Sequence, residues 1–482
     1  MHVVCFADGS TALGAGHQIR LAALAIALRW RGTQVTLVCR DQVGSAHGWA
    51  WAGQQVLVVS GTMSPLAAIE SALVGKVDAL VVDHYGLDTA ALTALAARVP
   101  LAIVDDQPGS RALPVGAMVV NPAPGIRPSD YPDVIPAVGP AHALLRPGFA
   151  GVRRADRPDG VLLLLGATDP GRHLPGAASA LLQAGWPVTV VASPTVSSRD
   201  ALDQLAAIDS RLVLAVGLDA ARLGAAMARH RVVVTTPSAG ALEAAATGST
   251  LVAVLTAANQ ERFASGLAAL GIPVLRAGEW AHLSAAVTRA VATGLVLRVD
   301  GQGARRVADR LTELGITTPG VHLRPGRFGD ADLLLAWAND PSTRAGSFRP
   351  EPITRSSHLA WMERQLADPE GRLWVAEAEG LPVGTVRLAR EGATATVSIA
   401  VAPEHRGQGW GGRLLAALAI WVERTGFVHR MLAWVREDNP TSRKLFLTAG
   451  YREVAHESVE GHAALRLELS IGTSGAVPVL PS

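Results

Sequence analysis

A glycine-rich stretch between a strand-like run and a long apolar helix carries the strongest chemical signal in the chain. It reads Arg406-Gly407-Gln408-Gly409-Trp410-Gly411-Gly412 and follows the β-rich run 398–402. Glycine lets the backbone amides of 407–412 approach a ligand closely, and the positive end of the helix dipole favours an anion. The pattern predicts a phosphate-binding loop. The alternative is a glycine-rich turn with no ligand.

A second glycine-rich loop lies near the N-terminus, between Asp8-Gly9-Ser10 and a helix that begins after Gly14-Ala15-Gly16-His17. An imidazole can take up a proton near neutral pH, so His17 is a candidate general base. The alternative is a tight turn whose histidine only caps the helix. Arg20 and Leu21 stand where a G-x-G-x-x-G fingerprint needs glycine, which disfavours dinucleotide binding.

Polar residues also follow two later strand-like runs, as Asp83-His84-Tyr85 and Asp105-Asp106. In open α/β sheets, ligands bind at the carboxyl ends of parallel strands. The positions therefore make Asp83, His84 and Tyr85 candidate catalytic residues and Asp106 a candidate substrate contact. The alternative is that these aspartates cap the next turn.

Two stretches in the middle of the chain repeat the order of strand, small-residue loop and helix start. They are Gly166-Ala167-Thr168-Asp169-Pro170 and 235–243, which contains Ser238-Ala239-Gly240. Backbone amides in Ser238–Gly240 would meet a diphosphate, with Glu243 one helical turn further on. Asn259-Gln260, after another strand-like run, are further candidates. The alternative is a capped helix with a surface carboxylate.

The elements that must position these residues fall into three segments. In the first two, strands alternate with helices, which predicts parallel, doubly wound sheets. The strand candidates there are Val3–Ala7, Val35–Val38, Val56–Val59, Ala79–Val82, Leu101–Val104, Ala117–Val120, Val161–Leu165, Val188–Val191, Leu212–Val216, Val232–Thr235 and Leu251–Leu255. The proline-rich stretch 122–147 is expected to be a long irregular crossover.

The third segment lacks regular strand–helix–strand units, which indicates α+β. Its strand candidates are Leu373–Glu377, Pro382–Leu388 and Thr394–Val401. The expected fold class is α/β: two Rossmann-like domains in a GT-B arrangement plus a C-terminal α+β domain. The expected boundaries are 1–150 for a sugar-binding and catalytic domain, 151–318 for a nucleotide-binding domain, 319–470 for the third domain and 471–482 for a disordered tail.

Composition agrees with a large folded enzyme. The 482 residues include 49% hydrophobic and 17% charged residues, and 43 basic against 41 acidic residues leave a net charge of +2. Such a balance excludes a dedicated nucleic-acid or membrane-surface binder. Two cysteines exclude a disulfide scaffold or a cysteine-based zinc site. With no signal peptide and no apolar run of about 18 residues, the protein is expected to be cytoplasmic.

Five motifs resemble, in order, those of the UDP-sugar hydrolase family of pseudaminic acid biosynthesis. They are Gly14-Ala15-Gly16-His17-Gln18-Ile19-Arg20, Val82-Asp83-His84-Tyr85-Gly86, Val104-Asp105-Asp106, Asn121-Pro122 and Leu144-Leu145-Arg146-Pro147-Gly148-Phe149. The resemblance covers about residues 1–315 and implies a fold like that of the peptidoglycan N-acetylglucosaminyltransferase. It implies that His17 activates water to hydrolyse UDP-2,4-diacetamido-2,4,6-trideoxy-β-L-altropyranose. Ala15, Gln18 and Ile19 depart from the family's pattern.

The resemblance also implies a UDP-binding second half, in which a glutamate placed like Glu243 accepts hydrogen bonds from ribose hydroxyls. UDP is a good leaving group, so a glycosidase-type pair of carboxylic acids is not required. No metal-ligand cluster or D-x-D motif is evident, and metal-independent hydrolysis is expected. The substrate-binding candidates are Gly14, Gly16, Arg20, Asp106, Asn121, Asp169, Ser238, Ala239, Gly240, Glu243, Asn259 and Gln260.

In the third segment, Arg406-x-x-Gly409-x-Gly411 fits the R/Q-x-x-G-x-G/A signature of the GNAT superfamily of N-acetyltransferases. Motifs over about 321–470, such as Trp337-Ala338-Asn339-Asp340-Pro341, resemble the acetyltransferase of the same pathway, which acetylates the 4-amino group of the UDP-sugar. The resemblance implies acetyl-CoA as co-substrate. The candidate CoA-binding residues are Val401, Arg406, Gly407, Gln408, Gly409, Trp410, Gly411, Gly412, Asn439 and Ser442.

One departure concerns the general acid of this segment. Phe446 stands where that family often has a tyrosine, and Tyr451 is the only tyrosine of the segment. Either water or Tyr451 then protonates the thiolate. Glu377, His358 and Glu404 are the candidate bases for the amine, each with a plain alternative as an exposed or packing residue.

Together these features predict a bifunctional nucleotide-sugar enzyme. Its acetyltransferase would acetylate a UDP-4-amino-4,6-dideoxy-sugar, and its N-terminal halves would hydrolyse the diacetamido product to UDP and free sugar. The expected partners are these small molecules, with no nucleic acid and no membrane. One alternative is a GT-B glycosyltransferase, in which an acceptor alcohol replaces water. Another is a catalytically silent UDP-sugar-binding module fused to the acetyltransferase.

Overall fold

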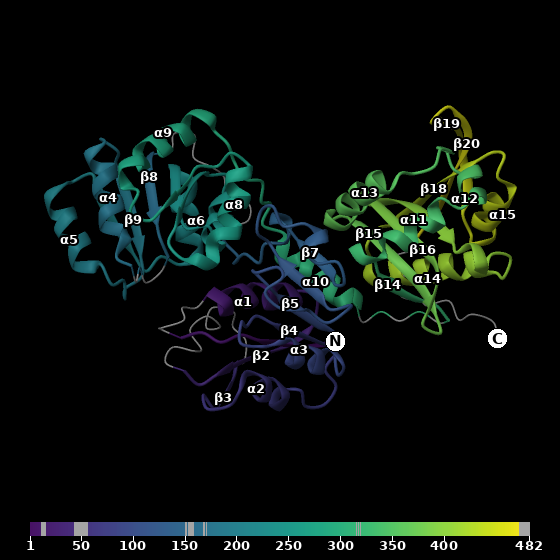
Figure 1. Cartoon of the computed structure of the whole chain (residues 1–482), viewed down its shortest axis with the longest axis horizontal. Helices are drawn as coiled ribbons and strands as arrows, with labels where there is room; N and C mark the ends of the chain where they lie inside the picture. Colours follow the sequence, from purple (N-terminus) through teal and green to yellow (C-terminus); the bar gives the residue numbers. More distant parts are fainter. Residues whose placement is uncertain are drawn as a thin grey trace. The chain divides into compact units, whose positions relative to one another are not determined.

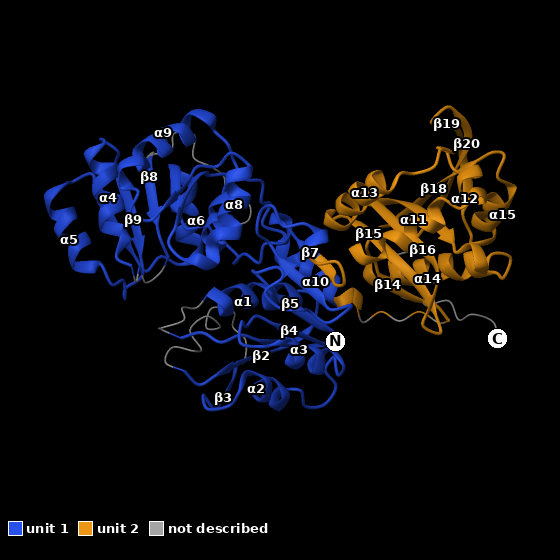
Figure 2. Cartoon of the chain, in the orientation of Figure 1, with its two compact units in different colours: residues 1–130, 137–311 blue, residues 131–136, 312–482 orange. Residues whose placement is uncertain are grey.

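The computed structural model describes residues 1–10, 16–42, 56–149, 152, 159–166, 169, 171–314, 316, 318 and 320–471 (Figure 1). The chain divides into two compact units, which Figure 2 shows in different colours. Unit 1 comprises Met1–Asp130 and Ala137–Leu311, and unit 2 comprises Tyr131–Pro136 and Thr312–Ser482.

The first sheet has seven strands in the order β3-β2-β1-β4-β5-β6-β7. Its strands are β1 His2–Phe6, β2 Gln34–Arg40, β3 Val56–Val59, β4 Ala79–Val82, β5 Leu101–Val104, β6 Met118–Asn121 and β7 Ile135–Val138, and its helices are α1 Gly16–Arg29, α2 Pro65–Ala72 and α3 Thr89–Ala96. The pairs from β3 through β6 are parallel. Because β1, β4 and β5 are neighbours, the residues that follow them meet at one edge of the sheet.

The second sheet of unit 1 is entirely parallel, in the order β10-β9-β8-β11-β12-β13. Its strands are β8 Asp159–Leu164, β9 Val188–Ala192, β10 Leu212–Val216, β11 His230–Thr235, β12 Thr250–Leu255 and β13 Val274–Arg276. Its helices are α4 His173–Gln183, α5 Arg199–Ile208, α6 Ala220–Arg229, α7 Ala239–Ala246, α8 Glu261–Ala269 and α9 Leu283–Thr293. The next helix, α10 Gly303–Leu314, contacts the first part of the chain instead: Arg31 binds Asp309, and Arg306 donates to the Ala141 carbonyl at 3.0 Å. Along β11, Val232 and Val234 join one apolar cluster and Val233 joins another, so helices cover both faces of the sheet.

Unit 2 contains a seven-stranded sheet in the order β14-β15-β16-β17-β18-β20-β19. Its strands are β14 His322–Pro325, β15 Gly371–Ala378, β16 Leu381–Glu391, β17 Thr394–Val401, β18 Arg430–Arg436, β19 Arg452–Val459 and β20 His462–Ser470. Its helices are α11 Ala331–Ala338, α12 Pro341–Ala345, α13 Arg355–Ala367, α14 Trp410–Thr425 and α15 Pro440–Thr448. All pairs are antiparallel except β17 with β18.

The expected mixed α/β class with parallel sheets is confirmed, and the bounds of β3, β4, β5, β10 and β17 agree with the predicted strands. The expected crossover at 122–147 is wrong in one place, since it contains the buried strand β7. Pro136 is tolerated there because β7 is the last strand of its sheet. The strands β13, β14 and β18–β20 were not predicted. In β19, polar residues and partial exposure hide the strand pattern.

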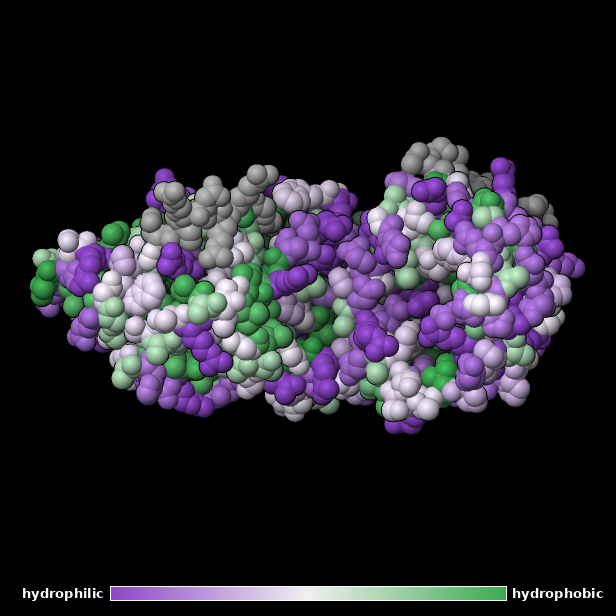
Figure 3. Space-filling view, turned by 90° about the horizontal axis from the view of Figure 1, so that it is seen from above, coloured by the Kyte–Doolittle hydropathy of each residue, from purple (hydrophilic) through white to green (hydrophobic). Residues whose placement is uncertain are grey.

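Many of the apolar residues of the chain are buried in its hydrophobic cores. Buried apolar residues form clusters on the sheets of both units. The face in Figure 3 shows hydrophilic residues interspersed with smaller hydrophobic groups. Among the described residues, no helix is both long and apolar enough to cross a membrane.

Candidate functional sites

His17, in the first turn of α1, lies against the carboxylate that follows β4. Its Nδ1 is 2.7 Å from Oδ1 of Asp83, whose side chain is fully buried. An ionised carboxylate only accepts hydrogen bonds, whereas the guanidinium of Arg20, whose Nη2 lies 3.0 Å from the same Nδ1, only donates, so Nδ1 donates to Asp83 or accepts from Arg20 according to the tautomer. In the tautomer that donates to Asp83, the lone pair for accepting a further proton is on Nε2. This is the histidine–carboxylate arrangement that positions a general base.

Arg20, one turn further along α1, bridges two aspartates. Its Nε and Nη2 donate to Asp83 at 2.5 and 2.8 Å, and its Nη1 and Nη2 donate to Asp106 at 2.9 Å each. The neighbouring carboxylates raise the pKa of Arg20, and Arg20 lowers the pKa of both Asp83 and Asp106 against the opposing effect of burial. The two carboxylates therefore stay ionised, and one cation holds them together.

Tyr85 completes this cluster. Its hydroxyl donates to Oδ2 of Asp106 at 2.7 Å, and its ring meets the ring of His17 edge-on at 5.0 Å between centroids. Burial and the nearby Asp106 charge raise the pKa of Tyr85, so the hydroxyl remains a donor. Tyr85 therefore contacts the general-base candidate through its ring and Asp106 through its oxygen.

His84 belongs to a separate cluster with Asp8 and Arg40. Its Nδ1 accepts from the amide of Gly86 at 2.9 Å, so its Nε2 donates to Oδ2 of Asp8 at 3.0 Å. Hydrogen bonds from His84 and Arg40 lower the pKa of Asp8 to about 2, although burial opposes them. Both ring nitrogens of His84 therefore have hydrogen-bond partners within the protein. This geometry supports a structural role for His84 and not the predicted catalytic one.

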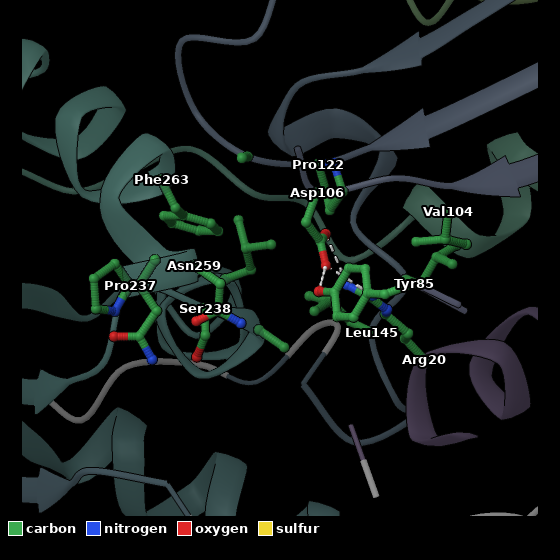
Figure 4. Close-up of a pocket in the computed structure, with 15 residues that line it drawn as sticks. Arg20, Tyr85, Val104, Asp106, Pro122, Leu145, Pro237, Ser238, Asn259 and Phe263 are labelled. Atoms are coloured by element: carbon green, nitrogen blue, oxygen red, sulfur yellow. Dashed lines mark hydrogen bonds and ion pairs between the residues drawn. The ribbon is translucent and has the colours of Figure 1, made fainter. Parts of the chain in front are cut away.

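A pocket in unit 1 collects seven of the predicted residues (Figure 4). Arg20, Tyr85 and Asp106 come from the first sheet, while Ser238, Ala239, Asn259 and Gln260 come from α7 and the turn after β12. His17 and Asp83 do not line it but contact the arginine and tyrosine that do. The sequence did not single out the lining residues Val104, Pro122, Ala123, Leu144, Leu145, Pro237, Leu242 and Phe263 as contacts.

Of the pocket residues that sequence reasoning missed, Phe263 could have been found. It lies in the first turn of α8, three residues after Gln260. At that spacing a helical side chain faces the same way as its neighbour in the preceding turn. Leu144 and Leu145 belong to a motif that was noted only for its family resemblance.

The N-termini of two helices in the second sheet differ in what occupies them. In α4, the Asp169 carboxylate accepts from the amides of His173 and Leu174 at 2.8 and 3.1 Å, and from the Ser198 hydroxyl at 2.7 Å. In α7, by contrast, the N-cap residue Ser238 makes no side-chain cap bond. Only α7 therefore presents its first amides to a ligand, while α4 is capped by the chain itself.

The Asp169→Ala variant is expected to lower the free energy of unfolding by about 2–3 kcal/mol. It removes the carboxylate that accepts from the first two amides of α4 and leaves the buried Ser198 hydroxyl without its partner, and Asp169 also has φ 45°, where alanine is strained. Urea titration measures the change. Asp219→Ala, which removes an exposed cap with one hydrogen bond, is the control and is expected to cost at most about 1 kcal/mol. Equal losses would contradict the prediction.

The polar side chains of Glu243, Gln260 and Asn121 are bound by other groups of unit 1. Glu243 is buried and pairs with Arg146 at 2.7 Å, and burial raises the pKa of its carboxyl despite that partner. Gln260 accepts from the amide of Thr256 at 2.9 Å, and buried Asn121 accepts from that of Ala123 at 3.1 Å. Gly16 begins α1, Gly240 lies in the first turn of α7, and Gly14 lies outside the described residues.

In unit 2, the glycine-rich loop joins β17 to α14. Gly407 and Gly409 have φ of 75° and 79°, a region that favours glycine, and Cβ atoms added at these positions would point into open space. Gly412 is equally open, whereas Gly411 packs against Leu445. The loop is exposed at the start of a 16-residue helix, so its amides and the helix dipole act in the same place.

The two strands beside this loop diverge. The pairing of β17 with β18 is confined to Thr394–Thr396 opposite Arg430–Leu432, although β17 continues to Val401 and β18 to Arg436. Beyond those three pairs, the edge of β17 that faces β18 is not used by that partner. An extended chain can therefore lie along it and hydrogen-bond to backbone groups.

The other predicted CoA contacts surround this opening. Gln408 donates to the Glu404 carbonyl at 3.2 Å, and the Arg413 guanidinium lies 4.6 Å over the ring of Trp410. Asn439 caps α15 by accepting from the Ser442 amide at 3.0 Å. The Arg406 guanidinium binds residues of α12, as described below.

The candidate acid and bases are not equally placed. Tyr451 is buried, its hydroxyl faces the Met431 sulfur at 3.9 Å, and burial raises its pKa. Glu377 pairs with Arg324 at 2.7 Å, and His358 is buried with a lowered pKa. Glu404 alone among these candidates is exposed.

The Tyr451→Phe variant is expected to transfer acetyl groups at a rate within about twofold of the wild type. A general acid contributes about 10²–10⁴-fold, whereas this hydroxyl contacts only a core sulfur. Single-turnover kinetics on the folded variant measures the effect. A loss above about tenfold would show instead that Tyr451 protonates the thiolate.

Comparison with known proteins agrees with this geometry. Residues 334–451 match the sequence model described as "Acetyltransferase (GNAT) family". The C-terminal part of the chain is a GNAT acetyltransferase domain. The open loop and the diverging strands fit a phosphate-bearing co-substrate with an extended arm. No curated protein matches the chain.

Solved structures of acetyltransferases are similar to about a third of the chain. Spermidine N-acetyltransferase from Vibrio cholerae, in complex with CoA and spermine, shares 19% identity over 32% of this chain and 97% of its own, with a TM-score of 0.29. The Salmonella typhimurium protein yncA with acetyl-CoA shares 23% identity over 33% and 97%, with a TM-score of 0.27. AAC(6')-Ib with ribostamycin and coenzyme A shares 16% identity over 31% and 93%, with a TM-score of 0.29.

Proposed function

We propose that the protein is a bifunctional enzyme of nucleotide-sugar metabolism. Its GNAT domain, 319–470, acetylates the 4-amino group of a UDP-4-amino-4,6-dideoxy-sugar. Residues 1–150 and 151–318 form a GT-B pair that hydrolyses the resulting UDP-2,4-diacetamido-2,4,6-trideoxyhexose to UDP and free sugar. The free sugar serves pseudaminic acid biosynthesis. Linking consecutive sites in one chain raises the effective concentration of the intermediate.

One observation carries the hydrolase half: a single pocket joins the cluster around Arg20 and Tyr85 to the free N-terminus of α7. The first supplies a positioned imidazole, and the second supplies amides for an anionic leaving group. Two carboxylates and one guanidinium give this cluster one excess negative charge. That charge favours the positive character that develops at an anomeric carbon.

These positions support the following hydrolytic step. His17 Nε2 takes a proton from water, and the water oxygen attacks the anomeric carbon as the bond from that carbon to the diphosphate oxygen breaks. The bonding electron pair leaves with UDP, whose charge the amides of Ala239 and Gly240 meet. Attack opposite the leaving group inverts the anomeric configuration. Asp83 holds the imidazole in place throughout.

In the GNAT domain, residues 407–412 would hold the co-substrate's phosphates through their amides, and the free edge of β17 would hold its pantetheine arm. Acetyl-CoA supplies the thioester that the acceptor amine attacks. Because Glu377 is ion-paired and His358 is buried, the amine proton passes to water or to Glu404. The thiolate takes its proton from water, since Tyr451 lies in the core.

Mass spectrometry of products tests both halves together. Purified protein with acetyl-CoA and the UDP-4-amino-sugar is expected to yield the acetylated UDP-sugar and then UDP with free sugar. No UDP release from the acetylated sugar without an added alcohol would favour a glycosyltransferase. If no UDP is released under any condition, the N-terminal domains are a binding module without hydrolase activity. No acetylation of this amine would mean another acceptor.

A further inference from the structure

The guanidinium of Arg406 is engaged by the chain itself. Its Nη1 donates to Oδ1 of Asp340 at 2.6 Å and to the Ser342 hydroxyl, and its Nη2 donates to the Thr343 hydroxyl at 2.7 Å. These partners lie at the start of α12, some 60 residues before the glycine-rich loop. The arginine thus joins that loop to α12.

Besides binding Arg406, Asp340 is the N-cap residue of α12. Its Oδ1 also accepts from the amides of Ser342 and Thr343 at 3.1 Å each. The hydrogen bond from Arg406 is the largest influence that lowers the pKa of Asp340. One carboxylate oxygen therefore serves both the helix cap and the loop arginine.

The far end of the same segment is tied to β18. Arg436, the last residue of that strand, donates from Nη1 to the Ser347 carbonyl at 2.9 Å. Gly346 packs so closely on the Asn439 side chain that an added Cβ would lie 3.0 Å from its Nδ2. We call residues 340–347 the strap. It runs from the loop that follows β17 to the end of β18.

The strap therefore spans the end at which β17 and β18 have separated, since their pairing stops at Thr396 and Leu432. Arg406 holds it on the β17 side and Arg436 on the β18 side. An amine that approaches a thioester in this opening from that end meets the strap first. The strap is thus placed to form a wall of the acceptor site.

We propose that Arg406 is a positioning residue, which couples the glycine-rich loop to the strap and so shapes the acceptor site, while the backbone amides of the loop bind the phosphates of the co-substrate. Binding of acetyl-CoA at the loop then orders the strap, and the acceptor binds to the ordered form. The acceptor part rests on the proposed acetylation of a UDP-4-amino-sugar. The part that concerns Arg406 and acetyl-CoA does not.

Two variants distinguish this role from direct phosphate binding, because one removes a positive charge and the other a negative charge from the same link. Arg406→Gln and Asp340→Asn both break the link, and asparagine still caps α12. A phosphate-binding Arg406 requires that Arg406→Gln weaken acetyl-CoA binding by tenfold or more and that Asp340→Asn leave it equal or tighter. If Arg406 only couples the loop to the strap, both variants keep the Kd for acetyl-CoA within about threefold of the wild-type value, because neither alters the backbone amides. Calorimetry measures this Kd.

Hydrogen exchange provides a readout that needs no acceptor. In the wild type, acetyl-CoA is expected to slow amide exchange in 340–347, and both variants are expected to lose this protection. Arg413→Gln removes another cation beside the loop without touching the strap, and it is expected to keep the protection. If the strap remains protected in both link variants, or if Arg406→Gln alone weakens acetyl-CoA binding tenfold, the proposal is overturned.

Acceptor kinetics completes the experiment. With the UDP-4-amino-sugar, both link variants are expected to raise the acceptor KM about tenfold and to leave the acetyl-CoA KM within about threefold. An unchanged acceptor KM would overturn the acceptor part. If the wild type does not acetylate this sugar, the proposed function fails, while calorimetry and exchange still decide the role of Arg406.

Discussion

The His17→Ala variant is expected to release UDP from the diacetamido sugar about 10³-fold more slowly than the wild type, with KM changed by less than about threefold. A general base contributes about 10²–10⁴-fold, and His17 contacts the pocket through Tyr85 without lining it. Acetyl transfer by the same molecule is expected to stay unchanged, because the GNAT domain is a separate unit. Steady-state assays of UDP release and of acetyl transfer measure the two activities.

His282→Ala is the matched control, since this exposed histidine lies outside the pocket in the same unit. It is expected to retain full UDP release. If His17→Ala also retains it, His17 is not the base, and the helix-capping alternative or a binding-only role for unit 1 gains support.

The Arg20→Met variant is expected to lose both stability and hydrolysis. Removing the guanidinium leaves Asp83 and Asp106 close together without their cation, and breaking a buried pair costs about 3–5 kcal/mol. Some of this cost is relieved if a carboxyl takes up a proton, so a loss of about 3 kcal/mol in unfolding free energy is expected. Hydrolysis is expected to fall about 10²-fold, because Asp83 no longer holds the imidazole in one orientation.

A double variant distinguishes positioning from direct substrate binding. If Arg20 acts through His17, adding Arg20→Met to His17→Ala lowers UDP release by less than about threefold further. If the losses multiply, Arg20 contacts the substrate itself, as its sequence position alone suggested. Arg31→Met breaks a partly exposed ion pair with Asp309 in the same unit. As a control for stability, it is expected to cost at most about 1 kcal/mol.

Much of the fold could be predicted because apolar periodicity marks buried strands directly. β4 and β5 are short, wholly buried and bounded by polar residues, so their bounds were predictable. β7 was not, because Pro136 argues against a strand until its place at the sheet edge is known. β19 was missed for a related reason: its residues alternate between exposed and partly buried, and none is fully buried.

The candidate site was predictable as a set of residues and less so as a set of roles. Asp83 and Asp106 could be assigned to one sheet edge from strand order alone. That Arg20 bridges them depends on side-chain geometry that spacing does not encode. Asp169 and Ser238 look alike in sequence, each before a helix after a strand, yet one caps its helix and the other leaves its helix open.

The sequence by itself determined which chemistry the chain can support. A histidine after a glycine loop, carboxylates at strand ends and a glycine-rich loop before a helix are local patterns, and their physical effects act within a few residues. Tertiary structure decided which of these groups are free. Hydrogen-bond partners come from distant parts of the chain, as with Arg406 and Asp340 or His17 and Asp83, and local sequence patterns do not encode such pairs.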